Sequence, residues 1–217
     1  FTPEESLAQF KLAPGFKIEL VAHEPMVKDP VFIEWDDEGR MWVGELRTYM
    51  MDLDGNGEDR RMSRVMVLED TNGDGVMDQA TPFLEDMLNV RSIAFVDGGV
   101  LVVETGGLWF CKDIDGDLRC DERKKLFDFA TSAKDNIEHA ENALHFTLDN
   151  WMYNSKSSRK FAWRHGQLIE LPAKPRGQWG MSSDAYGRLF YNHNGQWFET
   201  DWSVYDHQWP RAGQSVK

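Results

Sequence analysis

The chain repeats one simple pattern, a pair of short apolar segments separated by a turn of Asp, Asn or Gly. Each pair predicts a strand, a tight turn that Gly or Asn permits through a positive φ, and a second strand. Four such pairs follow one another at residues 31–43, 92–103, 143–153 and 180–191 of the 217-residue chain. Units of this kind, recurring at roughly 40–50 residues, must bury their faces against one another to form a core. This repetition constrains the fold more than any other feature.

A second repeat runs through the first two units. Two acidic loops begin at Asp70 and Asp113, 43 residues apart, and each lies between two apolar runs. Strand, acidic loop, strand is therefore also a repeated element. Together the two repeats predict an all-β chain and favour a β-propeller with about four blades. A β-sandwich is the alternative for a chain of many short strands.

The repeats predict how a single propeller domain over residues 1–217 is divided. The successive blade-like units span about 24–88, 89–135, 136–176 and 177–217. Residues 12–23 contain a lone apolar segment, which we expect to be a closing strand at the edge of a last blade. Four repeats are few for a closed ring, so we expect part of a larger propeller, or an incomplete one that a partner closes.

Charge excludes one class of function. The chain has 24 Lys and Arg against 37 Asp and Glu, a formal charge of −13. Because a nucleic-acid binder must neutralise phosphates, we do not expect nucleic acid as a partner. No apolar run approaches the roughly 20 residues that a membrane span needs.

The first acidic loop has the side-chain spacing of a calcium loop. Oxygen-bearing side chains occupy relative positions 1, 3, 5 and 9, and position 7 supplies a backbone carbonyl, as at the start of an EF-hand loop. Its predicted ligands are Asp70, Asn72, Asp74, Val76 and Asp78.

The second loop repeats this spacing, with Asp113, Asp115, Asp117, Arg119 and Asp121 as the predicted ligands. Neither loop has the Glu that an EF-hand carries at position 12, so the sequence fits a calcium loop whose ligands lie within nine residues. We therefore expect two calcium sites. The alternative is a pair of solvated Asp/Gly turns.

Several stretches resemble one bacterial family. They are residues 12–22, 29–33, 39–45, 68–78, 89–95, 139–144, 149–153 and 180–190. The sequence resembles proteins classed as membrane-bound dehydrogenases, whose N-terminal propeller is similar to sorbosone dehydrogenase and soluble quinoprotein glucose dehydrogenase. The resemblance covers about residues 12–195 and is strongest at the first acidic loop and at 149–153. It does not extend over residues 196–217.

The resemblance implies a location, a cofactor and a substrate class. It implies export to the periplasm or the cell surface, bound calcium, and pyrroloquinoline quinone (PQQ) as a further cofactor. A small sugar or alcohol is then the expected substrate. Many members carry a haem domain with a Cys-x-x-Cys-His motif, which this chain lacks, so a haem domain or further blades would come from outside the chain.

Two residues are candidates for the chemistry of such a dehydrogenase. By resemblance, His139 is the general base that takes the hydroxyl proton, for which an imidazole is suited by its pKa near neutrality. Arg91, before another inner strand, is the candidate ligand for quinone carboxylates. The alternatives are a loop histidine that bonds to backbone, and a non-catalytic propeller that binds protein or polysaccharide with calcium in a structural role.

Cys111 and Cys120 bracket the second acidic loop. A disulfide between them would join the end of a strand to the end of the loop and would suit an oxidising compartment. Two thiols, with Cys111 buried in its strand, are the alternative.

Overall fold

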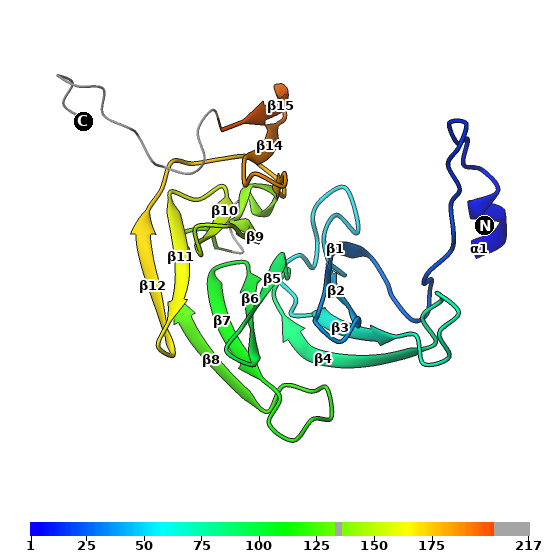
Figure 1. The fold of residues 1–217 in the computed structure, drawn as a ribbon, viewed down its shortest axis with the longest axis horizontal. Helices are drawn as coiled ribbons and strands as arrows, with labels where there is room; N and C mark the ends of the chain where they lie inside the picture. The colour runs from blue at the N-terminus through cyan, green and yellow to red at the C-terminus, as the bar shows by residue number, and fades with distance from the viewer. Residues whose placement is uncertain (133–135, 202–217) are drawn as a thin grey trace. The chain divides into compact units, whose positions relative to one another are not determined.

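The computed structural model describes residues 1–132 and 136–201. These residues are all-β, apart from the short helix α1 (Pro3–Leu7) and the 3₁₀ turn η1 (Ile137–His139), and they form four small antiparallel sheets (Figure 1). Contacts divide the chain into two units. The first comprises Phe1–Val90 and Asp113–Cys120, and the second comprises Arg91–Lys112 and the residues from Asp121 onward. The predicted fold class is confirmed, while 133–135 and 202–217 of the predicted blades lie outside the described residues.

The first unit contains one four-stranded sheet in the order β1-β2-β3-β4. Its strands are β1 (Pro30–Trp35), β2 (Met41–Glu45), β3 (Ser63–Glu69) and β4 (Gln79–Met87). The buried side chains of β2 and β3 form a core with residues of the adjoining loops, and its members are Val27, Met41, Val43, Met66, Leu68 and Met77.

The second unit contains three sheets. The first of them has the order β5 (Ser92–Val96), β6 (Gly99–Glu104), β7 (Gly107–Lys112) and β8 (Glu122–Phe127). The next is formed by β9 (Asn142–Phe146), β10 (Met152–Ser155), β11 (Arg159–Arg164) and β12 (Gln167–Pro172). The last has three strands, β13 (Ser182–Ser183), β14 (Leu189–His193) and β15 (Gln196–Thr200).

The β5–β6 hairpin shows how the sequence sets local structure. Asp97 and Gly98 both have positive φ, 52° and 67°, which gives the two-residue turn that matches the twist of paired strands. Gly99 follows because a Cβ there would lie 2.6 Å from the Phe110 ring and 2.8 Å from the Cys111 carbonyl. The hairpin therefore pairs Val96 with Gly99 and continues in register to Ser92, the first residue of β5.

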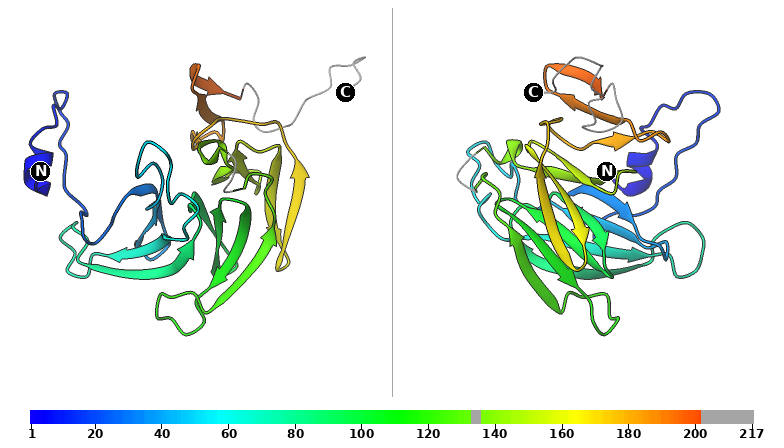
Figure 2. Two further views of the ribbon diagram at one scale, coloured as in Figure 1. Left: turned by 180° about the vertical axis from the view of Figure 1, so that it is seen from behind. Right: turned by 60° about the vertical axis from the view of Figure 1, so that its left-hand side comes forward.

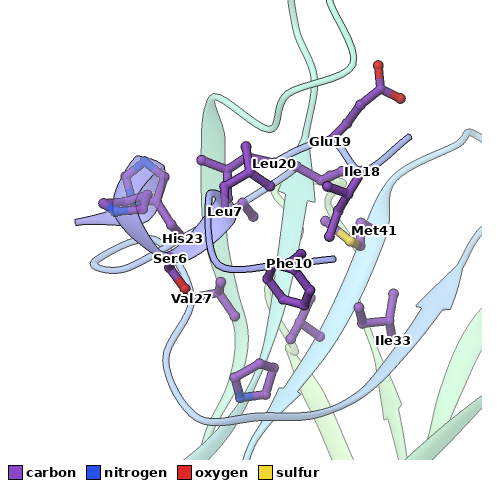
Figure 3. A pocket seen from close by; sticks show the side chains of 15 residues that line it. Ser6, Leu7, Phe10, Ile18, Glu19, Leu20, His23, Val27, Ile33 and Met41 are labelled. Atoms are coloured by element: carbon purple, nitrogen blue, oxygen red, sulfur yellow. The ribbon is translucent and has the colours of Figure 1, made fainter. Parts of the chain in front are cut away.

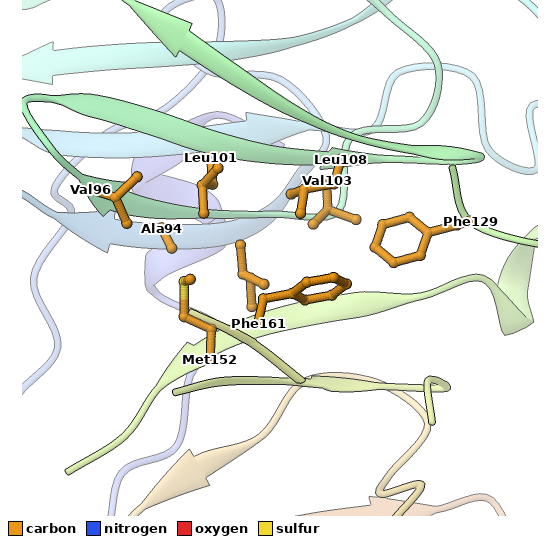
Figure 4. Close-up of a cluster of buried hydrophobic side chains, with 9 residues drawn as sticks. Ala94, Val96, Leu101, Val103, Leu108, Phe129, Met152 and Phe161 are labelled. Carbon is orange, nitrogen blue, oxygen red and sulfur yellow. The ribbon is translucent and has the colours of Figure 1, made fainter. Parts of the chain in front are cut away.

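The main core of the second unit lies between the sheet of β5–β8 and the sheet of β9–β12, which run side by side in Figures 1 and 2. All six residues of β6 are buried, as expected for a strand covered on both faces. Figure 4 shows the side chains that the two sheets bury together, namely Ala94, Val96, Leu101, Val103, Leu108, Phe129, Leu144, Met152 and Phe161.

Residues 12–23 differ from the prediction, because they form no strand. A strand needs a ladder of hydrogen bonds to a neighbour. Within the described part of its unit, this segment is tied to the loop after β3 by one backbone bond, from Met77 N–H to the Val21 carbonyl at 2.8 Å. Phe16 and Ile18 remain exposed. The segment has the apolar pattern of a strand, but the described residues of its unit contain no strand that pairs with it.

None of the helices in the described residues is long and apolar enough to cross a membrane.

Candidate functional site

The two acidic loops occupy the same position in their sheets. Residues 70–78 join β3 to β4, and residues 113–121 join β7 to β8. Each loop thus connects the third strand of a sheet to its outer strand. The acidic loops that repeat in the sequence therefore also repeat in their position within a sheet.

In the loop after β7, the structure brings three carboxylates together. Oxygen atoms of Asp113, Asp115 and Asp117 lie within 4.8 Å of one another. Asp113 accepts backbone N–H bonds from Gly116 at 2.7 Å and Leu118 at 2.8 Å, which bends the loop around its side chain. Leu118 has a positive φ of 64°, so it adopts the conformation that Gly75 takes in the first loop.

The other two predicted ligands of this loop have different surroundings. The Arg119 guanidinium lies 3.8 Å from Asp117 and donates to the Pro82 carbonyl at 3.4 Å. The Asp121 backbone N–H donates to the Lys112 carbonyl and closes the β7–β8 hairpin. The carboxylate of Asp121 is not a member of the three-acid group.

In the loop after β3, the side chains turn the backbone but form no group of three acids among the described residues. Asp70 accepts N–H bonds from Gly73, Asp74 and Gly75, and the bond from Gly75 is the main cause of its lowered pKa. The Asp78 carboxylate instead accepts from the N–H and hydroxyl of Thr71. Two further oxygens also accept backbone N–H bonds, that of Asn72 from Asp74 and that of Asp74 from Val76.

The donor set of both loops suits a hard cation. The side-chain ligands predicted there offer carboxylate or amide oxygens, with no nitrogen or sulfur donor among them. Calcium prefers such oxygens, and a cluster of carboxylates is electrostatically unfavourable without a cation. The chemistry of the loops therefore fits calcium.

Arg91 is enclosed by protein. Its side chain is 2% exposed, its Nε donates to the Thr105 hydroxyl at 3.2 Å, and its Nη2 donates to the Ile137 carbonyl. The guanidinium also lies over the Trp179 ring, 5.1 Å from the centroid. A group with these contacts supports the surrounding loops, and this environment does not fit the predicted role as a ligand of quinone carboxylates.

Replacing Arg91 with Met is expected to lower the free energy of unfolding by about 1.5–3 kcal/mol, because buried hydrogen bonds from a charged group are lost while the stem remains. Urea denaturation without any added cofactor measures this. The control is Arg164→Met, since that guanidinium donates to an exposed carbonyl, of Asn150, at 3.2 Å. Equal stability of the Arg91 variant and the native protein would contradict a supporting role.

His139 ends the turn that Arg91 holds. Asn136 caps η1 by accepting the Glu138 N–H at 3.1 Å, and Ile137 anchors the turn by burying its side chain. The backbone of His139 donates to the Asn136 carbonyl at 3.0 Å, while its imidazole is exposed. The structure thus brings the two candidate residues into one region, where Arg91 fixes the backbone and His139 presents a side chain to solvent.

Strand β7 lies in the chain between Thr105 and the second acidic loop. Thr105, which contacts Arg91, precedes β7, and the acidic loop follows Lys112 at the other end of β7. Six residues of strand span about 20 Å.

A buried polar network lies beyond His139, and the sequence alone did not reveal it. The Asn142 amide donates to the Gln178 carbonyl at 2.8 Å, and its oxygen accepts from the Gly180 N–H at 2.9 Å. Ser155 completes the group through its hydroxyl, which donates to the Gly180 carbonyl at 3.0 Å. This network joins the start of β9 to the segment before β13. Its only signal in the sequence was the nearness of Asn142 to His139.

A buried ion pair lies in the same unit. Arg176 Nε is 2.7 Å from Asp201 Oδ2, and both side chains are more than nine-tenths buried. The Tyr191 hydroxyl donates to Asp201 Oδ1 at 3.1 Å. Burial, followed by the adjacent Asp201 carboxylate, raises the pKa of Tyr191 to about 12. Asp201 lies past the end of the family resemblance, which is why the sequence did not single it out.

One apolar cavity lies in the first unit, between the N-terminal segment and the first sheet. Its volume is about 440 Å³ (Figure 3). Aliphatic and aromatic side chains form most of its wall, including Leu7, Phe10, Ile18, Leu20, Ile33 and Met41. Its polar side chains are Ser6, Glu19 and His23, and none of the predicted site residues lines it.

Cys111 is buried and Cys120 half-buried, and the structure contains both as thiols. The Cys120 backbone N–H donates to the Phe83 carbonyl at 2.8 Å, so this end of the second loop is attached to β4.

A family model matches residues 2–216, nearly the whole chain. The family is described as a domain of unknown function, DUF7133. The chain belongs to this family. No curated protein matches the DUF7133 chain.

Solved structures of propeller proteins resemble the DUF7133 chain. A candidate gluconolactonase aligns with a TM-score of 0.54 at 16% identity, covering 83% of this chain and 61% of its own. The holo form of the PQQ domain of pyranose dehydrogenase from Coprinopsis cinerea aligns with a TM-score of 0.52 at 11% identity, covering 83% and 46%. The DUF7133 chain thus spans about half of each, and at these identities the likeness concerns the fold.

Proposed function

We propose that the DUF7133 chain is the calcium-stabilised propeller part of an exported dehydrogenase that oxidises hydroxyl groups of sugars or alcohols, with His139 as general base. The observation that carries the proposal is the exposed imidazole of His139 on a turn that the buried Arg91 holds in place. The family resemblance and the fold shared with a PQQ domain support the reaction class. Export to the periplasm or cell surface belongs to the same proposal and rests on the resemblance.

The proposed oxidation requires a protein group that accepts the hydroxyl proton. A neutral imidazole can accept the proton that a hydroxyl loses on oxidation, and His139 provides this group. Solvent exposure lets a substrate reach it, and the anchored backbone of η1 limits its freedom. PQQ would serve as the electron acceptor, but its carboxylates would be held by groups other than Arg91, whose guanidinium contacts protein.

Dye reduction tests the proposed function. The chain, supplied with calcium and PQQ, is expected to reduce an artificial electron acceptor in the presence of aldoses or alcohols, and PQQ is expected to bind in an equilibrium titration. The same titration with the Arg91→Met variant separates cofactor binding from stability, because we expect PQQ affinity per folded molecule to be unchanged. Absence of both PQQ binding and dye reduction would refute the dehydrogenase.

Calcium is the second part of the proposal. A cation bound by the native state alone, at a hundred times its Kd, stabilises that state by about 2.7 kcal/mol. Excess chelator is therefore expected to lower Tm by about 5–10 °C in a chain of this size. Differential scanning calorimetry with and without chelator measures the effect, and elemental analysis identifies the metal.

Two matched variants locate the calcium. Asp113→Asn with Asp117→Asn is expected to reduce the shift in Tm that chelator causes, because it removes two carboxylates of the close group. Asp52→Asn with Asp54→Asn makes the same change of charge in an exposed acidic turn outside both loops and should leave the shift intact. The calcium sites would be refuted if the protein contains no bound metal and chelator does not change its Tm.

A further inference from the structure

The outer strand β8 carries an unusual concentration of positive charge for so acidic a chain. Arg123, Lys124 and Lys125 are consecutive and exposed, against a formal net charge of −13. Lysines on edge strands often serve only to prevent pairing with other chains. The outer strands of the other two four-stranded sheets, β4 and β12, contain no Lys or Arg. Protection of the edge therefore does not explain why the cations gather on β8.

A groove of about 790 Å³ lies beside this strand. One wall comes from β7 and β8, and the other from the β11–β12 hairpin, all within the second unit. Phe110, Lys112 and Lys124 lie on one face of their sheet, because Phe110 pairs directly with Lys124 and Lys112 is two residues further along. Neither lysine forms an ion pair with a residue that the structure describes.

The floor of the groove is aromatic and fixed in orientation. The rings of Phe110 and Trp163 stack with centroids 4.9 Å apart and planes 18° apart. The indole N–H of Trp163 donates to Asp97 at 3.2 Å, which prevents the ring from turning. Both rings are half-buried and line the groove.

The other two cations of β8 lie on the opposite face of the strand and pair with acids. Arg123 lies over the Trp109 ring at 4.3 Å and 3.8 Å from Glu104, and Lys125 pairs with Asp128. On the groove face, Lys112 and Lys124 are the cations, and Asp97 and Glu122 are the acids. The groove therefore presents both lysines and hydrogen-bond acceptors.

We propose that this groove binds an acidic polysaccharide, a polymer of sugars that carry carboxylates. Aromatic rings offer a flat apolar surface to the faces of sugar rings, lysines pair with carboxylates, and the two acids accept bonds from hydroxyl groups. The groove lies along an edge strand, beside which an extended chain can lie. Duplex nucleic acid is a weaker candidate, since its dense phosphates require many more cations than β8 provides. This inference does not depend on the proposed dehydrogenase.

Calorimetric titration with hyaluronate oligosaccharides, which carry a carboxylate on alternate sugars, tests the proposal. We expect saturable binding that weakens with salt, and no binding of neutral malto-oligosaccharides of similar length. Lys112→Gln with Lys124→Gln is expected to weaken binding roughly tenfold, as the loss of two charge contacts implies. Lys112 is half-buried and Lys124 is exposed, and Gln keeps most of the length of the side chain, so the fold should survive, which circular dichroism verifies.

Lys11→Gln with Lys17→Gln is the matched control, since it removes the same charge from exposed positions of the other unit. Its affinity is expected to stay within twofold of the native protein. Failure of the acidic oligosaccharides to bind, or an equal loss in both double variants, would overturn the proposal. So would tighter binding of duplex DNA or phosphatidylserine vesicles that depends on the same two lysines.

Discussion

Replacing His139 with Asn is expected to lower kcat for dye reduction about a hundredfold or more, because general-base catalysis by a positioned side chain contributes about 10²–10⁴ in rate. The amide of Asn cannot accept the hydroxyl proton but keeps a polar group of similar size on the turn. The stability of the variant should match that of the native protein, since the imidazole is exposed and η1 is held through backbone atoms and Ile137. Steady-state kinetics with a saturating electron acceptor provides the measurement.

His165→Asn is the control for this experiment. His165 is also exposed and lies in the β11–β12 turn with a φ of 51°, a conformation that Asn tolerates well. Its kcat should equal that of the native protein. A His139 variant with native kcat would refute its role as the base.

Replacing Asp201 with Ala is expected to lower the free energy of unfolding by about 3–5 kcal/mol, the cost of removing one partner from a buried ion pair. Arg176 would keep its bond to the Lys174 carbonyl but lose the carboxylate that balances its charge. The loss should also lower the pKa of Tyr191, because the Asp201 carboxylate is one of the causes that raise it. Chemical denaturation and a spectrophotometric titration of tyrosine measure the two effects.

Two further variants separate burial from charge pairing. Glu19→Ala breaks the Lys17–Glu19 pair, which has the same 2.7 Å distance but mostly exposed side chains, and should cost less than about 1 kcal/mol. Arg176→Met combined with Asp201→Leu should recover most of the stability, since apolar replacement of a whole buried pair is often neutral. If Asp201→Ala and Glu19→Ala lower the free energy of unfolding equally, burial does not make the Arg176–Asp201 pair more stabilising than an exposed pair.

The strands were predictable because they depend on local chemistry. The Asp97–Gly98 turn and the apolar runs on both sides specify a hairpin whatever else the chain does. Residues 12–23 were mispredicted for the opposite reason: their apolar pattern is local, whereas a strand also needs a neighbour to bond with. The acidic loops were found by their spacing, but that spacing did not show that Asp78 would pair with Thr71.

The contacts of the candidate site residues depend more on tertiary packing than on local sequence. A guanidinium before an inner strand has the same appearance in sequence whether it faces a ligand or a protein wall. Burial and the contacts with Thr105, Ile137 and Trp179 decide between these for Arg91. The link between Arg176 and Asp201 was not predictable either, because no periodicity relates residues 25 apart.

The sequence by itself determined the all-β class, the repeated hairpin and the two acidic loops, since turns and alternating apolar residues act over a few neighbouring positions. Only the tertiary structure decided that Arg91 supports the turn of His139. It also placed Trp163 against Phe110 beside the cations of β8. Those relations arise when sheets pack face to face, and packing joins residues that the chain keeps far apart.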